Sequence, residues 1–568
     1  MVNLNSQIMK KFNKYIYSAV FVVTALMGCQ KPQYVEPNDE VTINSFSASL
    51  PGDARNRIFG STIRNDTVFV NIDYFYPIDS DNEVDISKIL LQATIPYDSK
   101  IIPSISGLVD LTNPLHVSVL AGNGSEKKYV IVANKKGNTG VTSAVLTYED
   151  FTGATQEIDA IIIGKNINFS LVPGTVLNNA RITYQLNRHA TGSIVNGGSV
   201  NLSSPVPFTV SSAGNAQEKY TIQSIEAKKL EKGIRPGSAK IMFAKKLKAD
   251  LGINTENMTG GIAATGQYLI LNTRNENSLV LNGQTGANVG TIDLGALKGS
   301  VKNFYTTADD GGNILVNNLA PNDGNELKIY KLSSISSTPQ LLISWNAGGS
   351  TYGRKISVAG DITKNAIITA PLTGLAIQNS FARWQIINGS VVSQTPTIVS
   401  INNYSWTWNN ADVVYTNGTD INADYFAIGY GSTAANKLVK VNGMTHNISA
   451  SLNSLDANFV CNAVDYSEFN NGKFAAYTHL NGFTWGSADQ AFLIDTDAGM
   501  AGDPNSSSSL VWAATKGAYG PSAAMASANA NSTADVALVT SSNGYFLYMY
   551  FIFTNGYVVG VQFDCVDL

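Results

Sequence analysis

The sequence predicts an all-β protein of several domains, because of its length and its composition. The chain has 568 residues, and at about 150 residues per domain this length suggests three or four domains. Hydrophobic residues make up 44% of the chain, whereas charged residues make up only 14%. Together with 49 Gly and 25 Tyr, these values are typical of extracellular β-proteins and argue against coiled coils and disordered tails.

The charges and cysteines exclude two further classes. Lys and Arg number 38 against 42 Asp and Glu, and the resulting net charge of −4 is scattered along the chain. A nucleic-acid binder would concentrate positive charge on one face. Three cysteines in a chain of this length also exclude a scaffold built on disulfides.

Residues 1–28 form a predicted signal peptide. Lys10, Lys11 and Lys14 precede a short apolar run at residues 16–27. A stable membrane-spanning helix needs about 20 apolar residues, so this run reads as a targeting segment. The run ends in Leu26-Met27-Gly28-Cys29, which resembles the lipobox of bacterial lipoproteins. The resemblance implies lipidation at Cys29, and several acyl chains on one residue give a lasting membrane anchor. The alternative is a secreted protein in which Cys29 is incidental.

Residues 29–40 predict a tether between the lipid and the folded part. This stretch is polar, contains two prolines and has no apolar periodicity. Surface lipoproteins of the Bacteroidota usually carry acidic residues close behind the cysteine. Here the acids come later, at Glu36, Asp39 and Glu40, which leaves a periplasmic orientation open. We expect an outer-membrane protein that faces the cell exterior.

An internal repeat follows the tether. The segment at 109–119 aligns with 200–210, and the same shift of 91 residues carries 128–131 onto 219–222. A period near 90 residues with short alternating strands is the size of an immunoglobulin-like sandwich. We therefore expect immunoglobulin-like domains at 41–134 and 138–226. They resemble the tandem repeats of many Bacteroidota lipoproteins, in which such domains act as spacers.

We expect a linker and an entering strand at residues 227–258 and a β-propeller at residues 259–568. Six units, each a strand followed by a hairpin, recur at intervals near 50 residues. Asn282-Gly283 and Asn442-Gly443 are among their hairpin turns. A four-stranded propeller blade has about this length, so six blades are expected, with five or seven left open. The segment resembles propellers of Bacteroidota lipoproteins that have no assigned function.

Aromatic residues suggest a binding site in the predicted propeller. All six tryptophans lie there, and Trp406 and Trp408 flank one threonine. On a strand, both rings would share one face and form a platform for sugar rings, with amide side chains as partners for hydroxyls. The predicted glycan-binding residues are Trp406, Trp408, Tyr404, Asn402, Asn409 and Trp485. The alternative role for the tryptophans is packing between blades.

Catalytic residues, cofactors and bound metals are not expected. The chain lacks the His-Glu-x-x-His, nucleophile-elbow, phosphate-loop and Cys-x-x-Cys motifs. Asp495 and Asp497 resemble part of a calcium loop, but acidic hairpin turns look the same without metal.

The whole pattern resembles surface glycan-binding proteins of starch-utilisation-type systems. It implies a lipid-anchored protein that binds extracellular polysaccharide or oligosaccharide for uptake, with an uptake transporter complex as a further partner. A protein-interaction or adhesion module and a glycan-cleaving propeller enzyme are the alternatives.

Replacement of Cys29 tests the anchor. Cys29→Ala should leave the protein without acyl chains and move it out of the membrane fraction, because those chains are its expected means of insertion. Fractionation of cells that express both forms measures this shift. Equal membrane partitioning of the two forms would refute lipidation at Cys29.

Overall fold

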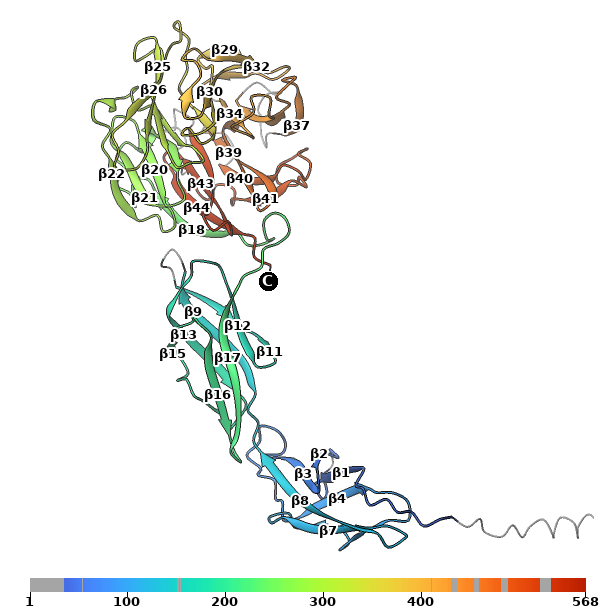
Figure 1. Cartoon of the computed structure of the whole chain (residues 1–568). Coiled ribbons are helices and arrows are strands. Elements are labelled where there is room, and N and C mark those ends of the chain that lie inside the picture. Colours follow the sequence, from blue (N-terminus) through green and yellow to red (C-terminus); the bar gives the residue numbers. More distant parts are fainter. Residues whose placement is uncertain are drawn as a thin grey trace, which may run out of the picture. The chain divides into compact units, whose positions relative to one another are not determined.

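The computed structural model describes residues 35–53, 55–150, 153, 155–409, 411–430, 437–453, 459–481, 489–521 and 533–567 (Figure 1). The chain forms two compact units: Met1–Glu149, Thr155–Phe169 and Val176–Ser224 make up unit 1, and Asp150–Ala154, Ser170–Thr175 and Ile225–Leu568 make up unit 2. In these described ranges, all regular structure is β-strand except two 3-10 turns, η1 (Glu256–Met258) and η2 (Gly295–Leu297). The predicted all-β class is therefore confirmed. No helix within this part of the chain has the length and apolar character needed to cross a membrane.

Unit 1 begins with one eight-stranded sheet, in the order β5-β7-β8-β3-β2-β1-β4-β6. Its pairs are antiparallel except β3 with β8, which run parallel. The alternating strand β7 buries Val117 and Val119 in the core, as the period of two predicts. The strands are β1 (Ser45–Ser49), β2 (Ile58–Arg64), β3 (Thr67–Asp73), β4 (Ile89–Thr94), β5 (Lys100–Ile102), β6 (Leu108–Val109), β7 (Leu115–Leu120) and β8 (Glu126–Lys136).

The second half of unit 1 repeats this strand order in two sheets, β10-β9-β13-β15 and β11-β12-β17-β16-β14. If β10 and β11 together replace β2, each strand occupies the position of its counterpart in the first copy. The predicted internal repeat is therefore confirmed at the level of topology. The strands are β9 (Val141–Glu149), β10 (Thr155–Asp159), β11 (Ile161–Ile163), β12 (Asn166–Leu171), β13 (Val176–Leu186), β14 (Thr191–Gly192), β15 (Gly198–Val200), β16 (Val206–Ser212) and β17 (Ala216–Glu226).

Unit 2 consists of six main antiparallel sheets, numbered here in chain order as sheets 1 to 6. Each predicted strand-and-hairpin unit supplies the second and third strands of one sheet. Sheets 1 and 2 contain β19 (Thr259–Ala264), β20 (Tyr268–Thr273), β21 (Ser278–Asn282) and β22 (Asn288–Ile292), then β23 (Tyr305–Ala308), β24 (Ile314–Asn317), β25 (Glu326–Leu332) and β26 (Gln340–Asn346). Sheet 3 contains β27 (Ser357–Gly360), β28 (Ala366–Pro371), β30 (Ser380–Ile387), β31 (Ser390–Val391) and β32 (Thr397–Ser400).

The remaining sheets follow the same plan. Sheets 4 and 5 contain β34 (Ala411–Tyr415), β35 (Tyr425–Gly429), β36 (Leu438–Val441) and β37 (Ile448–Leu452), then β38 (Phe459–Phe469), β39 (Gly472–Asn481), β40 (Gln490–Asp495) and β41 (Leu510–Ala513). Sheet 6 contains β42 (Ala534–Thr540), β43 (Phe546–Phe553), β44 (Tyr557–Asp564) and β18 (Lys240–Lys246). A separate ribbon pairs β29 (Leu375–Gln378) with β33 (Trp406–Trp408).

The first strands of the six sheets form a closed ring of contacts. Strand β19 contacts β23, then β23 contacts β27, β27 contacts β34, β34 contacts β38, β38 contacts β42, and β42 contacts β19. Strand β18, from the start of unit 2, pairs with β44, from its end. Sheet 6 therefore joins the two ends of the unit, and few sheet edges are left unprotected.

Part of the expected linker lies against the sheets of unit 2. The Arg235 guanidinium forms a two-pronged ion pair with Asp564, at 2.7 and 2.6 Å. The Gly233 N–H donates to the Asn470 carbonyl at 2.7 Å. Residues 229–238 are thus bonded to the sheets rather than free, whereas β18 confirms the expected entering strand.

Carboxylates bond the inner strands to one another. Asp412 on β34 accepts the Val464 N–H of β38 at 3.2 Å, and Asp465 on β38 accepts the Leu538 N–H of β42 at 2.7 Å. Asp535 on β42 accepts the Ile262 N–H of β19 at 2.8 Å, and so closes the ring. These bonds fix the position of each inner strand relative to the next.

Asp412 should make the stability of unit 2 depend on pH. Burial raises the pKa of Asp412 to about 6, while Lys355 and the Ser357 hydroxyl oppose that shift. The native state then binds more protons than the unfolded state between about pH 4 and pH 6, so the free energy of unfolding falls as pH rises through this window, by up to ~1.4 kcal/mol per pH unit.

Urea unfolding of wild type and Asp412→Asn at a series of pH values measures this dependence. The free energy of unfolding of the variant should depend less steeply on pH in this window, because the introduced amide does not titrate. The amide oxygen can still accept the hydrogen bond from the Ser357 hydroxyl. Parallel slopes for the two proteins would show that Asp412 does not titrate in this window.

Candidate functional site

The ring has an opening at each end of its inner strands. We call the opening at their first residues the basic opening, which is lined among others by Asn257, Arg274, Phe304, Arg354, Asn409 and Thr533. We call the opening at their last residues the acidic opening, which is lined among others by Thr265, Asp310, Thr416, Asp465, Glu468 and Thr540. The basic opening contains about 470 Å³ of empty space and the acidic opening about 1480 Å³, each counted out to the solvent.

Local backbone geometry places the two arginines at the basic opening. Arg274 follows the last residue of β20, and its N–H donates to the Met258 carbonyl at 3.2 Å. Arg354 follows Gly353, which has a φ of +94°. A Cβ atom at Gly353 would lie 2.2 Å from the Asn318 carbonyl oxygen, so only glycine fits this turn.

The two guanidinium groups share the ring of Phe304. The Arg274 Cζ lies 4.8 Å and the Arg354 Cζ 5.5 Å from the ring centroid. Burial lowers the pKa of Arg274. Burial, together with repulsion from Arg274, lowers the pKa of Arg354 to about 10, so both side chains stay charged at neutral pH. The aromatic face offsets part of the lost hydration of the cations.

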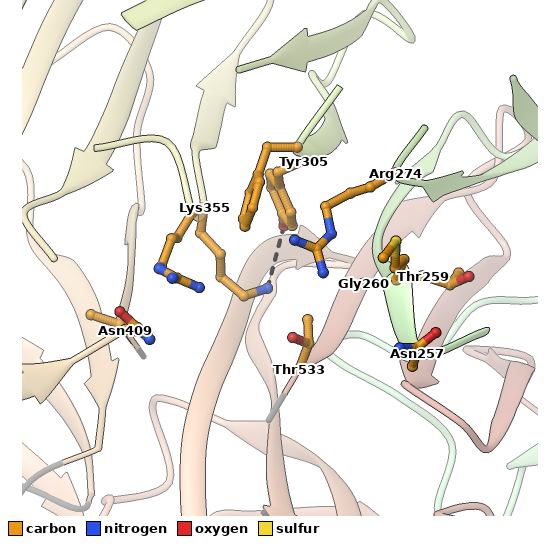
Figure 2. A pocket seen from close by; sticks show the side chains of 12 residues that line it. Asn257, Thr259, Gly260, Arg274, Tyr305, Lys355, Asn409 and Thr533 are labelled. Atoms are coloured by element: carbon orange, nitrogen blue, oxygen red, sulfur yellow. Dashed lines mark hydrogen bonds between the residues drawn. The ribbon is translucent and has the colours of Figure 1, made fainter. Parts of the chain in front are cut away.

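Lys355 is the third cation of the basic opening, and it is paired. Its Nζ lies 2.7 Å from Asp535 and 4.7 Å from the centre of the Tyr305 ring. The Tyr305 hydroxyl donates to the same carboxylate at 2.9 Å. Burial raises the pKa of Asp535, and Lys355, Ile262 N–H and Tyr305 oppose that shift. In Figure 2, Arg274 and Lys355 extend toward one another beneath Tyr305.

The structure corrects the expected platform of two exposed tryptophans. Trp406 is completely buried, and its indole N–H donates to the Leu372 carbonyl at 2.8 Å. Trp408 is 58% exposed. Its φ of +57° interrupts the alternation of the strand, so the two rings do not share a face. Trp406 is therefore packing between sheets, and Trp408 alone remains accessible.

The other predicted site residues fall in different places. Tyr404 is buried and donates to the Lys437 carbonyl, while Asn402 is exposed and bonds to Thr445 and Asn447. Asn409 is half-buried and lines the basic opening, so it is the predicted residue that reaches this site. Cys29 and Trp485 lie outside the described residues.

The suspected calcium loop uses one of its acids for an ion pair. Asp497 lies 2.8 Å from Lys232, which lowers the pKa of that carboxyl. The Asp497 N–H donates to Asp495 within the same hairpin turn. In the part of the chain that the structure describes, no group of three His, Cys, Asp or Glu side chains has a metal-binding arrangement.

Sequence reasoning missed Arg274 and Arg354, although one signal was present. Residues 241–568 contain only three arginines, and the third, Arg383, donates to Tyr415 and to the Ile421 carbonyl. Because arginine is rare in these residues, each arginine is a candidate for a specific role. A second missed signal is the triplet Ala-Asp-Val, which occurs at 411–413 and at 534–536 and supplies two of the carboxylates that bond the ring.

Two known families match parts of the chain. The family described as Domain of unknown function (DUF8500) matches residues 241–564, which is more than half of the chain. The protein belongs to this family. A second description, Domain of unknown function (DUF5018), matches residues 24–133. None of the curated proteins matches the chain.

Solved structures of low identity resemble the chain. A DUF4623 family protein from Bacteroides eggerthii is 15% identical with a TM-score of 0.45, over 75% of this chain and 98% of its own. A protein of unknown function from Bacteroides thetaiotaomicron is 11% identical with a TM-score of 0.32, over 79% and 94%. A putative exo-beta-1,3-galactanase from Bifidobacterium bifidum is 12% identical with a TM-score of 0.30, over 43% and 89%.

Two alanine variants separate the roles of the tryptophans. Trp406→Ala should lower the free energy of unfolding by about 3–5 kcal/mol, because it leaves a cavity between sheets and an unpaired carbonyl. Trp408→Ala should change it by less than about 0.5 kcal/mol, because the side chain is exposed. Urea unfolding of both variants measures the contrast. Equal losses in the two variants would contradict the assignment of Trp406 to the core.

Proposed function

We propose that this protein is an outer-membrane lipoprotein whose C-terminal ring of sheets binds extracellular glycan at the basic opening. The single observation that carries the binding proposal is the opening itself. Residues from sheets 1, 2, 3, 4 and 6 converge there, and they combine an aromatic ring with amide, hydroxyl and guanidinium groups. Such a mixture of a flat apolar face and hydrogen-bonding groups suits a sugar, which has C–H faces and hydroxyls.

We interpret the ring as a six-bladed β-propeller. The closed cycle of inner strands and the pairing of β18 with β44 support this interpretation, because propellers close their ring by completing one blade from both chain ends. Ligand sites at the mouth of a channel through repeated sheets use side chains from many blades. The basic opening has that property.

We interpret the two repeats of unit 1 as immunoglobulin-like spacers. In the second repeat, the sheet around β9 accompanies a sheet that contains the last two strands, and the first repeat has the same strand order in one continuous sheet. The parallel pairing of an early strand with the last one, β3 with β8, suits a sandwich whose first strand changes sheets. Spacers carry no ligand in this proposal and would separate the binding unit from the membrane.

The proposed location depends on the lipobox at residues 26–29. A lipid at Cys29 would hold the protein on the outer membrane, facing the cell exterior. There it would capture polysaccharide or oligosaccharide for an uptake transporter complex. The supporting features are the predicted signal peptide and the polar tether.

A glycan array with a blocked variant tests the proposal. A soluble form that starts at residue 35 should retain one class of glycan. Asn409→Trp should lower that affinity at least about tenfold while the melting temperature stays close to wild type, because a bulky side chain at a half-buried position fills the opening. Titration calorimetry measures the affinity.

Trp408→Ala is the matched control. Trp408 precedes Asn409 in the chain, but its exposed ring belongs to the β29–β33 ribbon and not to the basic opening. Its affinity should equal that of wild type. Failure to retain any glycan, with capture of a protein partner instead, would favour the adhesion alternative. A loss of affinity in Trp408→Ala alone would move the glycan site to the ribbon.

A further inference from the structure

The basic opening holds two positive charges that no described residue neutralises through an ion pair. The ion pairs among the described residues involve other cations and include neither Arg274 nor Arg354. The Arg354 Nε is buried and has no hydrogen-bond partner within this part of the chain. A buried donor without a partner costs free energy, and two neighbouring cations repel each other.

The third cation does not change this charge, because Lys355 has its own partner. Lys355 and Asp535 are both almost fully buried and lie 2.7 Å apart. Because the two groups form an ion pair, Lys355 adds no net charge to the opening. The opening therefore carries the two positive charges of Arg274 and Arg354, and none of its described lining residues is acidic.

The rest of the chain offers almost no other acid to the two arginines. Of the residues outside the described ranges, Asp456 is the one acidic residue in the sequence. The segment 522–532, which precedes Thr533 at the opening, contains no Asp or Glu. An anion from outside the protein is therefore the expected partner of the two arginines.

We infer that the basic opening binds an anionic group, and that the glycan of the proposed function is therefore an acidic one, with a carboxylate or a sulfate ester. This inference rests on the proposed function for the sugar part of the ligand and on the two arginines for its charge. The planar guanidinium fork matches the oxygen pairs of carboxylates and sulfates, and partial burial strengthens such contacts. Asn409 supplies an amide for neighbouring hydroxyls.

Titration calorimetry with four polymers tests the inference on the soluble form that starts at residue 35. The polymers are polygalacturonate, which carries carboxylates, dextran sulfate, which carries sulfates, neutral dextran, and poly-glutamate, an acid without sugar. We expect binding of polygalacturonate or dextran sulfate, and whichever of the two binds identifies the anion. Dextran and poly-glutamate should bind at least tenfold more weakly.

The double variant Arg274→Gln with Arg354→Gln assigns the binding to the opening. It should weaken binding of the acidic glycan by roughly 100-fold, because hydrogen bonds to charged groups are among the strongest in proteins. Its melting temperature should stay at or above that of wild type, because the guanidinium groups make no ion pair that would be lost. Lys364→Gln is the matched control: it removes one positive charge from an exposed turn after β27, and it should bind like wild type.

The outcomes separate the two proposals. Neutral dextran bound as tightly as the acidic polymers, with no loss in the double variant, would overturn the anionic ligand and leave glycan binding in place. Poly-glutamate bound as tightly as the acidic glycans would overturn the glycan and assign the arginines to an acidic peptide. Equal losses of affinity in the double variant and in Lys364→Gln would show that binding depends on net charge alone. That result would overturn the assignment of the anion to the basic opening.

Discussion

Hydrogen bonds from backbone N–H groups to aspartate carboxylates hold the six sheets of unit 2 in a ring. The first strand of each sheet has one edge that no strand of its own sheet can pair. A buried N–H on that edge needs an acceptor, because an unpaired one costs free energy. At three of the six joints, an aspartate from one sheet accepts such an N–H from the next, through Asp412, Asp465 and Asp535. At a fourth joint, Asp309 accepts the N–H of Ile362, which lies in the turn after β27.

These carboxylates also explain why the middle of the ring is polar although the sheets pack through apolar clusters. The three aspartates on β34, β38 and β42 place carboxyl groups within the ring, and burial raises the pKa of Asp465 to about 8. Lys355, which precedes β27 of sheet 3, reaches Asp535 on sheet 6. The buried ion pair links sheets that are not neighbours in the ring. Removal of one partner would leave a buried charge unpaired, which is more destabilising than replacement of both.

More of the fold than of the candidate site could be predicted from the sequence. Alternation of apolar residues and Asn-Gly turns identified the strands, and the constant shift of 91 residues identified the repeat, because both depend on local order along the chain. The exposure of Trp406 and Trp408 depends instead on the φ of Trp408 and on the pairing of β29 with β33, which no local pattern reveals. Arg274 and Arg354 are 80 residues apart and meet at Phe304 because sheets 1, 2 and 3 pack side by side.

Folding alone does not account for the two arginines at the basic opening. Each could be replaced by a neutral side chain without loss of an ion pair, and the replacement would relieve both the repulsion between them and the cost of removing them from water. The third arginine of residues 241–568 shows the contrast, since Arg383 donates to Tyr415 and to a carbonyl and so contributes to packing. Gly353, whose backbone conformation suits only glycine, nevertheless directs Arg354 to the opening. A rigid turn that presents an unpaired cation is the arrangement expected of a binding group, because a ligand then meets a charge already in position.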